Sequence, residues 1–249
     1  MGKSSPNKRA ASSIDAREQP YNSRETGPID RVQLSVENIT ILHGIVLDVD
    51  LDLYRPDGPP PLDLSSPRAF ADSTLIPMLD RHAALRGAEV RDSGRNVHVI
   101  VWLAEPVVLA DDGTRRRWAG IVKVIQAALP IDPDMPGITA LTRPVGSINS
   151  RTNRPVTILR PGTPVPASEL LKLHDQMTRT PFQAVMGILF GPDRVSPCPI
   201  CRAAGSSLAA LPRHGQCYGS CGKVKLEKLY DAFLAPRALI TAECADAIA

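Results

Sequence analysis

The chain has 249 residues, of which 43% are hydrophobic and 22% are charged, and its formal net charge is +3 at pH 7. This is ordinary globular composition, and so small a charge does not by itself indicate nucleic-acid binding. Aromatic residues make up only 4% of the chain, which argues against a base-stacking platform. No apolar run reaches the roughly 20 residues of a membrane helix, and the N-terminus carries no signal-peptide core. We therefore expect a cytoplasmic protein with no membrane partner.

The distribution of residue types predicts three regions. Residues 1–30 are polar and have no sustained hydrophobic period, so they are expected to form a flexible leader. Residues 31–165 are expected to form one folded domain, and residues 166–249 to hold helices, a cysteine-rich module and a helical tail. The expected fold class is α+β, with small antiparallel or mixed sheets flanked by helices.

The first strong pattern is the segment 38–54, in which apolar side chains alternate with aspartates as they do in a strand. Asp48, Asp50 and Asp52 would share one face. Carboxylates this close repel one another, and a divalent cation with oxygen ligands, Mg²⁺ or Mn²⁺, removes the repulsion. The alternative is a solvated strand edge.

A helix is expected over 67–85, ending at Gly87. After a turn at Ser93-Gly94, a second strand begins at Asn96, and its alternation places Asn96 and His98 on the polar face. A histidine at such a position is either a structural residue or a donor to a phosphate oxygen.

Further elements follow in order. A capped helix is expected over 114–129, followed by an acidic connector, 130–136, that contains Asp132 and Asp134. The other expected elements are a strand over 139–143, a hairpin partner for it over 156–159, helices over 167–179 and 182–190, and helix from Val224 to the end.

The order of these motifs resembles the archaeo-eukaryotic primase superfamily. That superfamily has an apolar run followed by Asp-x-Asp, then a small polar residue two positions before a histidine, then an apolar residue followed by Asp. The matching segments are 44–50, 93–98 and 131–132. The pattern Arg-x-x-Gly-Ser-x-Asn over 143–149 is similar to the one found in primase-polymerases of plasmids and phages. The resemblance covers about residues 39–159.

The resemblance implies that residues 31–165 form a primase-type catalytic core, which transfers nucleotides from NTPs or dNTPs on a single-stranded DNA template by a two-metal mechanism. Asp48, Asp50 and Asp132 match the positions that hold catalytic Mg²⁺ or Mn²⁺. Asp134 competes with Asp132 for the third position, and Asp52 is an extra carboxylate with no counterpart.

The resemblance also implies a nucleotide-binding set. His98 matches the residue that contacts the phosphates of the incoming nucleotide, and Arg143 would assist it. Ser93 and Asn96 belong to the same motif, although Asn96 stands where the family usually has serine.

Four of the five cysteines fall in one short segment, as Cys-x2-Cys followed by Cys-x3-Cys across a loop of 15 residues. They are Cys198, Cys201, Cys217 and Cys221. In a reducing compartment this spacing predicts a tetrahedral structural zinc site of the zinc-ribbon type, with disulfides as the alternative. His214 could replace one ligand, and Cys244 is expected to be a packed thiol.

Seven basic residues and two acidic residues lie between Arg194 and Arg237, a local excess of five positive charges. Such residues either contact phosphates without reading sequence or simply keep the surface solvated. Two other functions remain open: a non-catalytic zinc-ribbon protein that binds DNA during replication, and a metal-dependent nuclease. The sequence has no P-loop, so a separate replicative helicase is an expected partner.

Overall fold

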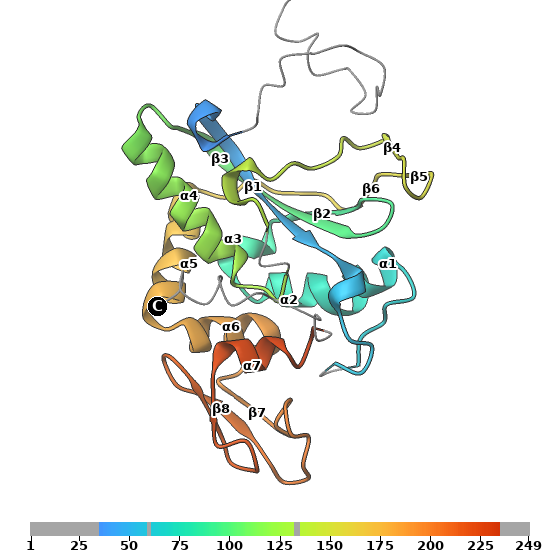
Figure 1. Cartoon of the computed structure of the whole chain (residues 1–249), viewed down its shortest axis with the longest axis vertical. Helices are drawn as coiled ribbons and strands as arrows, with labels where there is room; N and C mark the ends of the chain where they lie inside the picture. Colours follow the sequence, from blue (N-terminus) through green and yellow to red (C-terminus); the bar gives the residue numbers. More distant parts are fainter. Residues whose placement is uncertain (1–34, 59–60, 132–134, 235–249) are drawn as a thin grey trace, which may run out of the picture. The chain divides into compact units, whose positions relative to one another are not determined.

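The computed structural model describes residues 35–58, 61–131 and 135–234. These residues form a mixed α+β fold with two four-stranded antiparallel sheets and helices packed beside them (Figure 1). The expected leader, 1–30, lies outside the described residues. No helix in the described ranges is long and apolar enough to cross a membrane.

The larger sheet has the strand order β1-β3-β2-β6, and every neighbouring pair is antiparallel. Its strands are β1 (Ile41–Val49), β2 (Glu89–Asp92), β3 (Val97–Val108) and β6 (Thr157–Arg160). One face is apolar, because alternate residues of β1 and β3 such as Leu47, Val49, Val97 and Val99 are completely buried. Asp48, His98, Arg91 and Glu89 lie on the opposite face, because their register positions alternate with these apolar residues.

The first strand is shorter than the sequence pattern predicts. It ends at Val49, and a 3-10 helix, η3 (Leu51–Leu53), follows at once. The Asp50 carboxylate caps this helix by accepting a hydrogen bond from the backbone N–H of Asp52 at 3.1 Å. Capping by aspartate competes with strand hydrogen bonding, so the expected strand over 38–54 is wrong beyond Val49, and only Asp48 of the three aspartates lies on the sheet.

The expected hairpin between 139–143 and 156–159 is also wrong. Residues 140–147 are in no strand, and β6 pairs with β2 instead. Pro144 has no N–H to donate to a ladder, which disfavours a strand at this point. The short hairpin here is formed by β4 (Ile148–Asn149) and β5 (Arg154–Pro155), which follow a 3-10 turn, η5 (Gly137–Thr139).

The helix expected over 67–85 is present but interrupted. It consists of α1 (Pro67–Phe70), a π turn η4 (Ala71–Leu75), α2 (Ile76–Asp80) and α3 (Ala83–Arg86). Pro77 has no N–H for the helical ladder, which accounts for the wider turn before it. The break before α3 is capped by His82, whose Nδ1 accepts from the backbone N–H of Ala84 at 3.2 Å.

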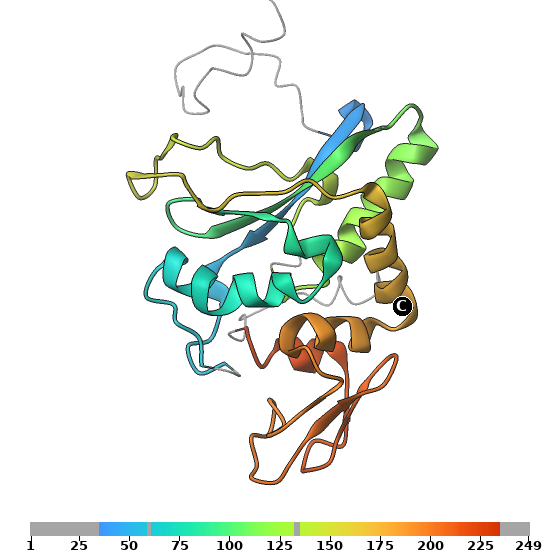
Figure 2. The same cartoon turned by 180° about the vertical axis from the view of Figure 1, so that it is seen from behind.

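The next three helices confirm the sequence prediction to within a few residues. They are α4 (Asp112–Gln126), α5 (Ala167–Arg179) and α6 (Pro181–Phe190), and a short 3-10 turn, η2 (Val36–Asn38), precedes β1. Asp111 caps α4 by accepting from the N–H of Thr114 at 2.7 Å. Gln126 at the other end donates to the Val46 carbonyl at 3.2 Å, so the end of α4 is hydrogen-bonded to β1. Figure 2 shows the larger sheet and its helices from behind.

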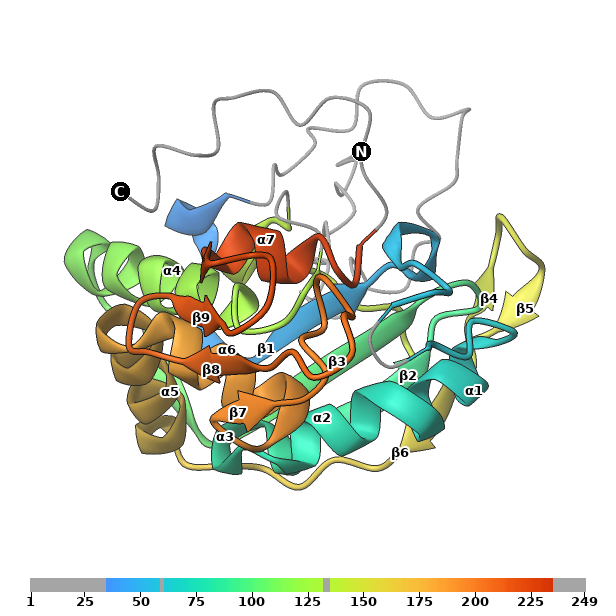
Figure 3. The same cartoon turned by 90° about the horizontal axis from the view of Figure 1, so that it is seen from below.

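The smaller sheet has the order β10-β9-β8-β7. Its strands are β7 (Arg194–Val195), β8 (Leu208–Ala210), β9 (Gly215–Cys217) and β10 (Lys223–Val224), and α7 (Leu226–Tyr230) follows. Seen from below, β8 and β9 lie across α6 (Figure 3). The expected helix from Val224 to the end is described only as α7, because residues 235–249 lie outside the described residues.

Gly215 sets how closely the smaller sheet approaches α6. A Cβ at this position would lie 2.5 Å from a ring carbon of Phe182 and 2.7 Å from Leu208. Gly215→Ala should therefore lower the free energy of unfolding by about 1–3 kcal/mol through overpacking. Gly120→Ala is the matched control, because Gly120 is a helical glycine whose added Cβ meets nothing within 4 Å. That change should stabilise the protein by about 0.5–1 kcal/mol. Denaturant unfolding measures both, and equal effects would contradict the packing account.

Candidate functional site

The polar face of the larger sheet brings together Asp48, His98 and Arg91. The antiparallel register pairs Asp48 of β1 with His98 of β3, and His98 with Arg91 of β2. Directly paired residues project from the same face. The Asp48 side chain is 44% exposed and that of His98 only 9%, so the carboxylate lies at the accessible end of the row.

His98 is a neutral imidazole at pH 7. Burial, and then the positive charges of Arg143 and Arg91, lower its pKa to about 4. Its Nε2 lies 3.7 Å from an Asp48 carboxylate oxygen, and its Nδ1 lies 2.9 Å from the Thr142 hydroxyl. Because the ring is uncharged, the contact with Asp48 is not an ion pair.

The surroundings of His98 favour one tautomer. A carboxylate near Nε2 favours a proton on that nitrogen, since a lone pair there would face a negative charge. Nδ1 then carries the lone pair, and the Thr142 hydroxyl donates to it. In this state Nε2 is a hydrogen-bond donor on the Asp48 side of the ring.

Arg91 is fixed by an unusually polar set of neighbours for a central strand. Its Nε donates to Glu89, and Trp102 donates to the other Glu89 oxygen at 3.0 Å. Its Nη1 donates to the backbone carbonyl of Arg143 at 3.0 Å. The guanidinium thus ties the segment that carries Thr142 and Arg143 to the sheet.

Ser93 and Asn96 form the turn between β2 and β3. The Ser93 hydroxyl donates to the Asn96 carbonyl at 3.0 Å and accepts from the Asn96 N–H at 3.2 Å. Gly94 lies between them at φ +87°, a conformation that favours glycine. Asn149, the last residue of the Arg-x-x-Gly-Ser-x-Asn pattern, donates to the Ser93 carbonyl at 2.8 Å. The second motif and this pattern therefore meet, and the Ser93 hydroxyl bonds within the turn.

The other acidic candidates divide into two groups. Asp50 follows β1 directly and caps η3, while the exposed Asp52 forms an ion pair with Arg95 of the β2–β3 turn. Asp132 and Asp134 lie outside the described residues, so the choice between them for the third carboxylate stays a prediction.

Sequence reasoning missed Arg91 and Glu89. The signal was present in the turn, because closing it with Ser93 opposite Asn96 fixes the register that places Arg91 opposite His98. Alternation then puts Glu89 on the same face as Arg91. The register set by this turn therefore predicts Arg91 and Glu89 as two charged residues on the polar face of a buried strand.

The four clustered cysteines form a separate candidate site in the smaller sheet. The sulfur atoms of Cys198, Cys201, Cys217 and Cys221 all lie within 4.8 Å of one another. The Cys201 and Cys217 sulfurs are 3.8 Å apart, far longer than a disulfide bond of about 2.05 Å. Sulfurs about 2.3 Å from a tetrahedral zinc ion lie roughly 3.8 Å from each other. The cluster could therefore hold a structural metal ion such as zinc.

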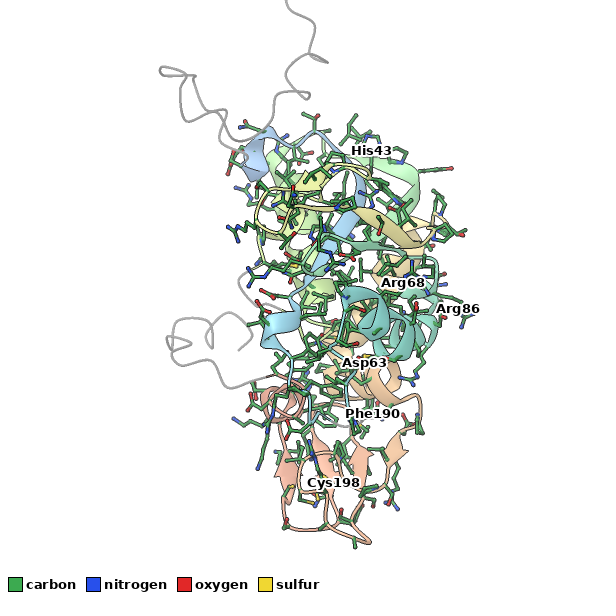
Figure 4. All side chains as sticks on the ribbon, turned by 90° about the vertical axis from the view of Figure 1, so that its right-hand side faces the viewer. His43, Asp63, Arg68, Arg86, Phe190 and Cys198 are labelled. Atoms are coloured by element: carbon green, nitrogen blue, oxygen red, sulfur yellow. The ribbon has the colours of Figure 1, made fainter. Side chains whose placement is uncertain are left out.

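Local hydrogen bonds fix the cysteine loops in place. The N–H of Gly219 donates to the Cys217 sulfur at 3.3 Å, and the Cys198 N–H donates to the Ser206 hydroxyl at 3.1 Å. Hydrogen bonds from the backbone of Ala203, and then from Ser206, lower the pKa of Cys201 to about 5. His214 is not part of the cluster. In Figure 4, Cys198 lies within this module, and Phe190 lies toward the helices of the core.

No protein-family model matches the chain, and neither the curated proteins nor the solved structures include a significant match.

The Thr142 contact predicts the tautomer of His98. In protein labelled with ¹⁵N-histidine, the nitrogen chemical shifts of His98 should show a protonated Nε2 and an unprotonated Nδ1. Thr142→Val removes the donor to Nδ1 with little change in shape and leaves only the Asp48 carboxylate to favour a proton on Nε2, so the other tautomer should become detectable, whereas Thr142→Ser should keep the original one. A spectrum unchanged by Thr142→Val would show that the hydroxyl does not control the ring.

The cysteine cluster predicts bound metal. Freshly purified, reduced protein should contain about one zinc ion per chain by elemental analysis. Cys201→Ser should lower both this content and the melting temperature, because metal binding contributes directly to the stability of so small a module. Cys244, whose expected packing lies outside the described residues, gives the matched control Cys244→Ser, which should leave the metal content unchanged. Metal-free wild-type protein with a normal melting temperature would contradict the prediction.

Proposed function

We propose that the protein is a primase or primase-polymerase of the archaeo-eukaryotic type, which transfers nucleotides from NTPs or dNTPs to a growing strand on a single-stranded DNA template. The observation that carries the proposal is the pairing of Asp48 with His98 on adjacent strands, with both side chains on one polar face. The superfamily resemblance relates these two residues only by the order of their motifs in the sequence. The register of β1 and β3 makes them neighbours in space, which is a separate observation.

The acidic end of this row suits a divalent cation. Asp48 and Asp50 offer carboxylate oxygens at the end of β1, a donor set that fits Mg²⁺ or Mn²⁺ and not a softer metal. Together with Asp132 or Asp134 they would hold the ions. When bound, such ions lower the pKa of the attacking 3′-hydroxyl and offset the charge of the phosphates.

The rest of the row would bind and orient the triphosphate. His98 would donate from Nε2 to a phosphate oxygen, and Thr142 would keep the proton on that nitrogen. The exposed Arg143, whose charge acts on His98, would supply positive charge beside it. A neutral histidine suits this role, because it stays a donor without changing its protonation state during the reaction.

The cysteine module would have a structural role. Four cysteine sulfurs leave no open coordination position, so a zinc ion held there would stabilise the module and take no part in transfer. Zinc at this site and Mg²⁺ or Mn²⁺ at the carboxylates are therefore proposed for separate purposes.

Removal of one carboxylate tests the proposal. Asp48→Asn keeps the size of the side chain but removes a metal ligand, which is worth several kcal/mol, or about a hundredfold or more in rate. Asp63→Asn is the matched control, since Asp63 is an exposed loop carboxylate that bonds to Ser65. The assay incubates each protein with labelled template, labelled primer, triphosphates and Mg²⁺ or Mn²⁺. Extension or new short products that depend on Asp48 would support transfer. Degradation of the strands would instead indicate a nuclease, and no divalent-dependent reaction would indicate a non-catalytic DNA-binding protein.

A further inference from the structure

The smaller sheet presents one row of side chains on its outer face. The register pairs Arg194 with Ala209, Ala209 with Gln216, and Gln216 with Lys223. Because directly paired residues share a face, this row crosses all four strands. Arg194 and Lys223 at its two ends are exposed, and the two residues between them are half-buried.

The opposite face of this sheet is buried. Leu208 and Val224 are completely inaccessible, and Cys217, which pairs with Leu208, is a member of the cysteine cluster. Gly215 on this side lies against Phe182 of α6. The sheet therefore has one face occupied by the cysteine cluster and the core, and one face open to solvent.

Tyr218 adds an aromatic ring to the open face. It comes two residues after Gln216, and it is 59% exposed even though it directly follows a buried cysteine. The Arg194 guanidinium lies 4.7 Å from the centre of its ring, a cation–π contact that holds ring and charge together. An exposed aromatic ring beside a basic side chain offers stacking for a base and charge for its phosphate.

The electrostatic surroundings favour an anionic partner. Residues 194–226 contain five arginines and lysines and no aspartate or glutamate. Lys225, two residues beyond Lys223, is also exposed. Asp193 and Glu227 flank this segment, and Asp57 forms an ion pair with Arg202. Five basic and two acidic residues over 193–227 leave an excess of three positive charges, which suits a chain of phosphates.

We propose that the outer face of the β7–β10 sheet binds single-stranded nucleic acid, with Tyr218 stacking on a base and Arg194 and Lys223 contacting phosphates. A single strand fits better than a duplex, because the faces of duplex bases already stack on one another and cannot reach an exposed tyrosine. The surface is built from other strands than those of Asp48 and His98, and binding to it requires no nucleotide transfer.

The test measures binding of a fluorescent oligothymidylate of about 12 nucleotides by anisotropy, without triphosphates. Tyr218→Leu should weaken binding about five- to hundredfold, the range measured for loss of one stacking contact. Tyr218→Phe keeps the ring and should bind as the wild type does. A duplex of the same length should be insensitive to both changes.

Charge variants test the phosphate contacts. Arg194→Gln and Lys223→Gln should each reduce the slope of log affinity against log salt by about 0.7. Lys172→Gln, on the exposed surface of α5, is the matched control and should leave the slope unchanged. Metal content and melting temperature check that each variant is folded. Should Tyr218→Leu fail this check, Tyr218→Ser, which is smaller and polar, is the second variant.

Two results would overturn the inference: unchanged oligonucleotide binding in a folded Tyr218 variant that lacks the ring, or displacement by polyglutamate as effective as by unlabelled oligothymidylate. The second would identify a general site for acidic polymers. Failure of this surface and failure of the proposed function remain distinguishable. A protein that binds the strand through Tyr218 but extends no primer would refute nucleotide transfer alone, and a protein that extends primers while Tyr218→Leu leaves binding unchanged would refute this surface alone.

Discussion

The register between β1 and β3 is the constraint on which the candidate site depends. Side chains alternate along a strand, so a slip of one residue would move every side chain of a strand to the other face. Here the slip is prevented by the apolar face, where Leu47 is paired with Val99 and Val49 with Val97, all completely buried. Exposing such a set would cost about 1.5–3 kcal/mol for each large side chain. The burial of aliphatic residues on one face thus fixes the contact of Asp48 with His98 on the other.

A second constraint acts on the segment that crosses the polar face. Residues 140–147 belong to no strand, so no sheet ladder positions Thr142 and Arg143. A series of hydrogen bonds positions them instead. Trp102 and Arg91 both donate to Glu89, and Arg91 also donates to the Arg143 carbonyl. A buried ion pair contributes little net stability compared with apolar packing, but breaking one is expensive. Here the Arg91–Glu89 pair positions the backbone of residues 142–143, so that the Thr142 hydroxyl reaches His98.

Much of this arrangement follows from local sequence, and the rest does not for identifiable reasons. Period-two alternation identified β1 and β3, and capping residues with 3.6-residue periodicity located α4, because both signals are local. The end of β1 was missed because the Asp50 side chain caps the 3-10 helix η3, and this cap ends the strand although the apolar alternation continues. The partner of β6 was missed because the paired residues, such as Asp92 and Thr157 or Val90 and Arg160, are far apart in the sequence and leave no local signal. The cysteine cluster could be predicted from its spacing because two short loops bring all four sulfurs together without any distant element.

The smaller sheet illustrates why average composition is a poor guide to a binding surface. A content of 4% aromatic residues argues against stacking only if the rings are distributed at random. Strands of two or three residues bury too little surface to be stable alone, so the inner face of this sheet is occupied by the cysteine cluster and by packing against α6. That arrangement leaves the outer face with no structural task. A tyrosine and an arginine that contribute nothing to the core can then be exposed side by side, and one ring in such a place is sufficient for stacking.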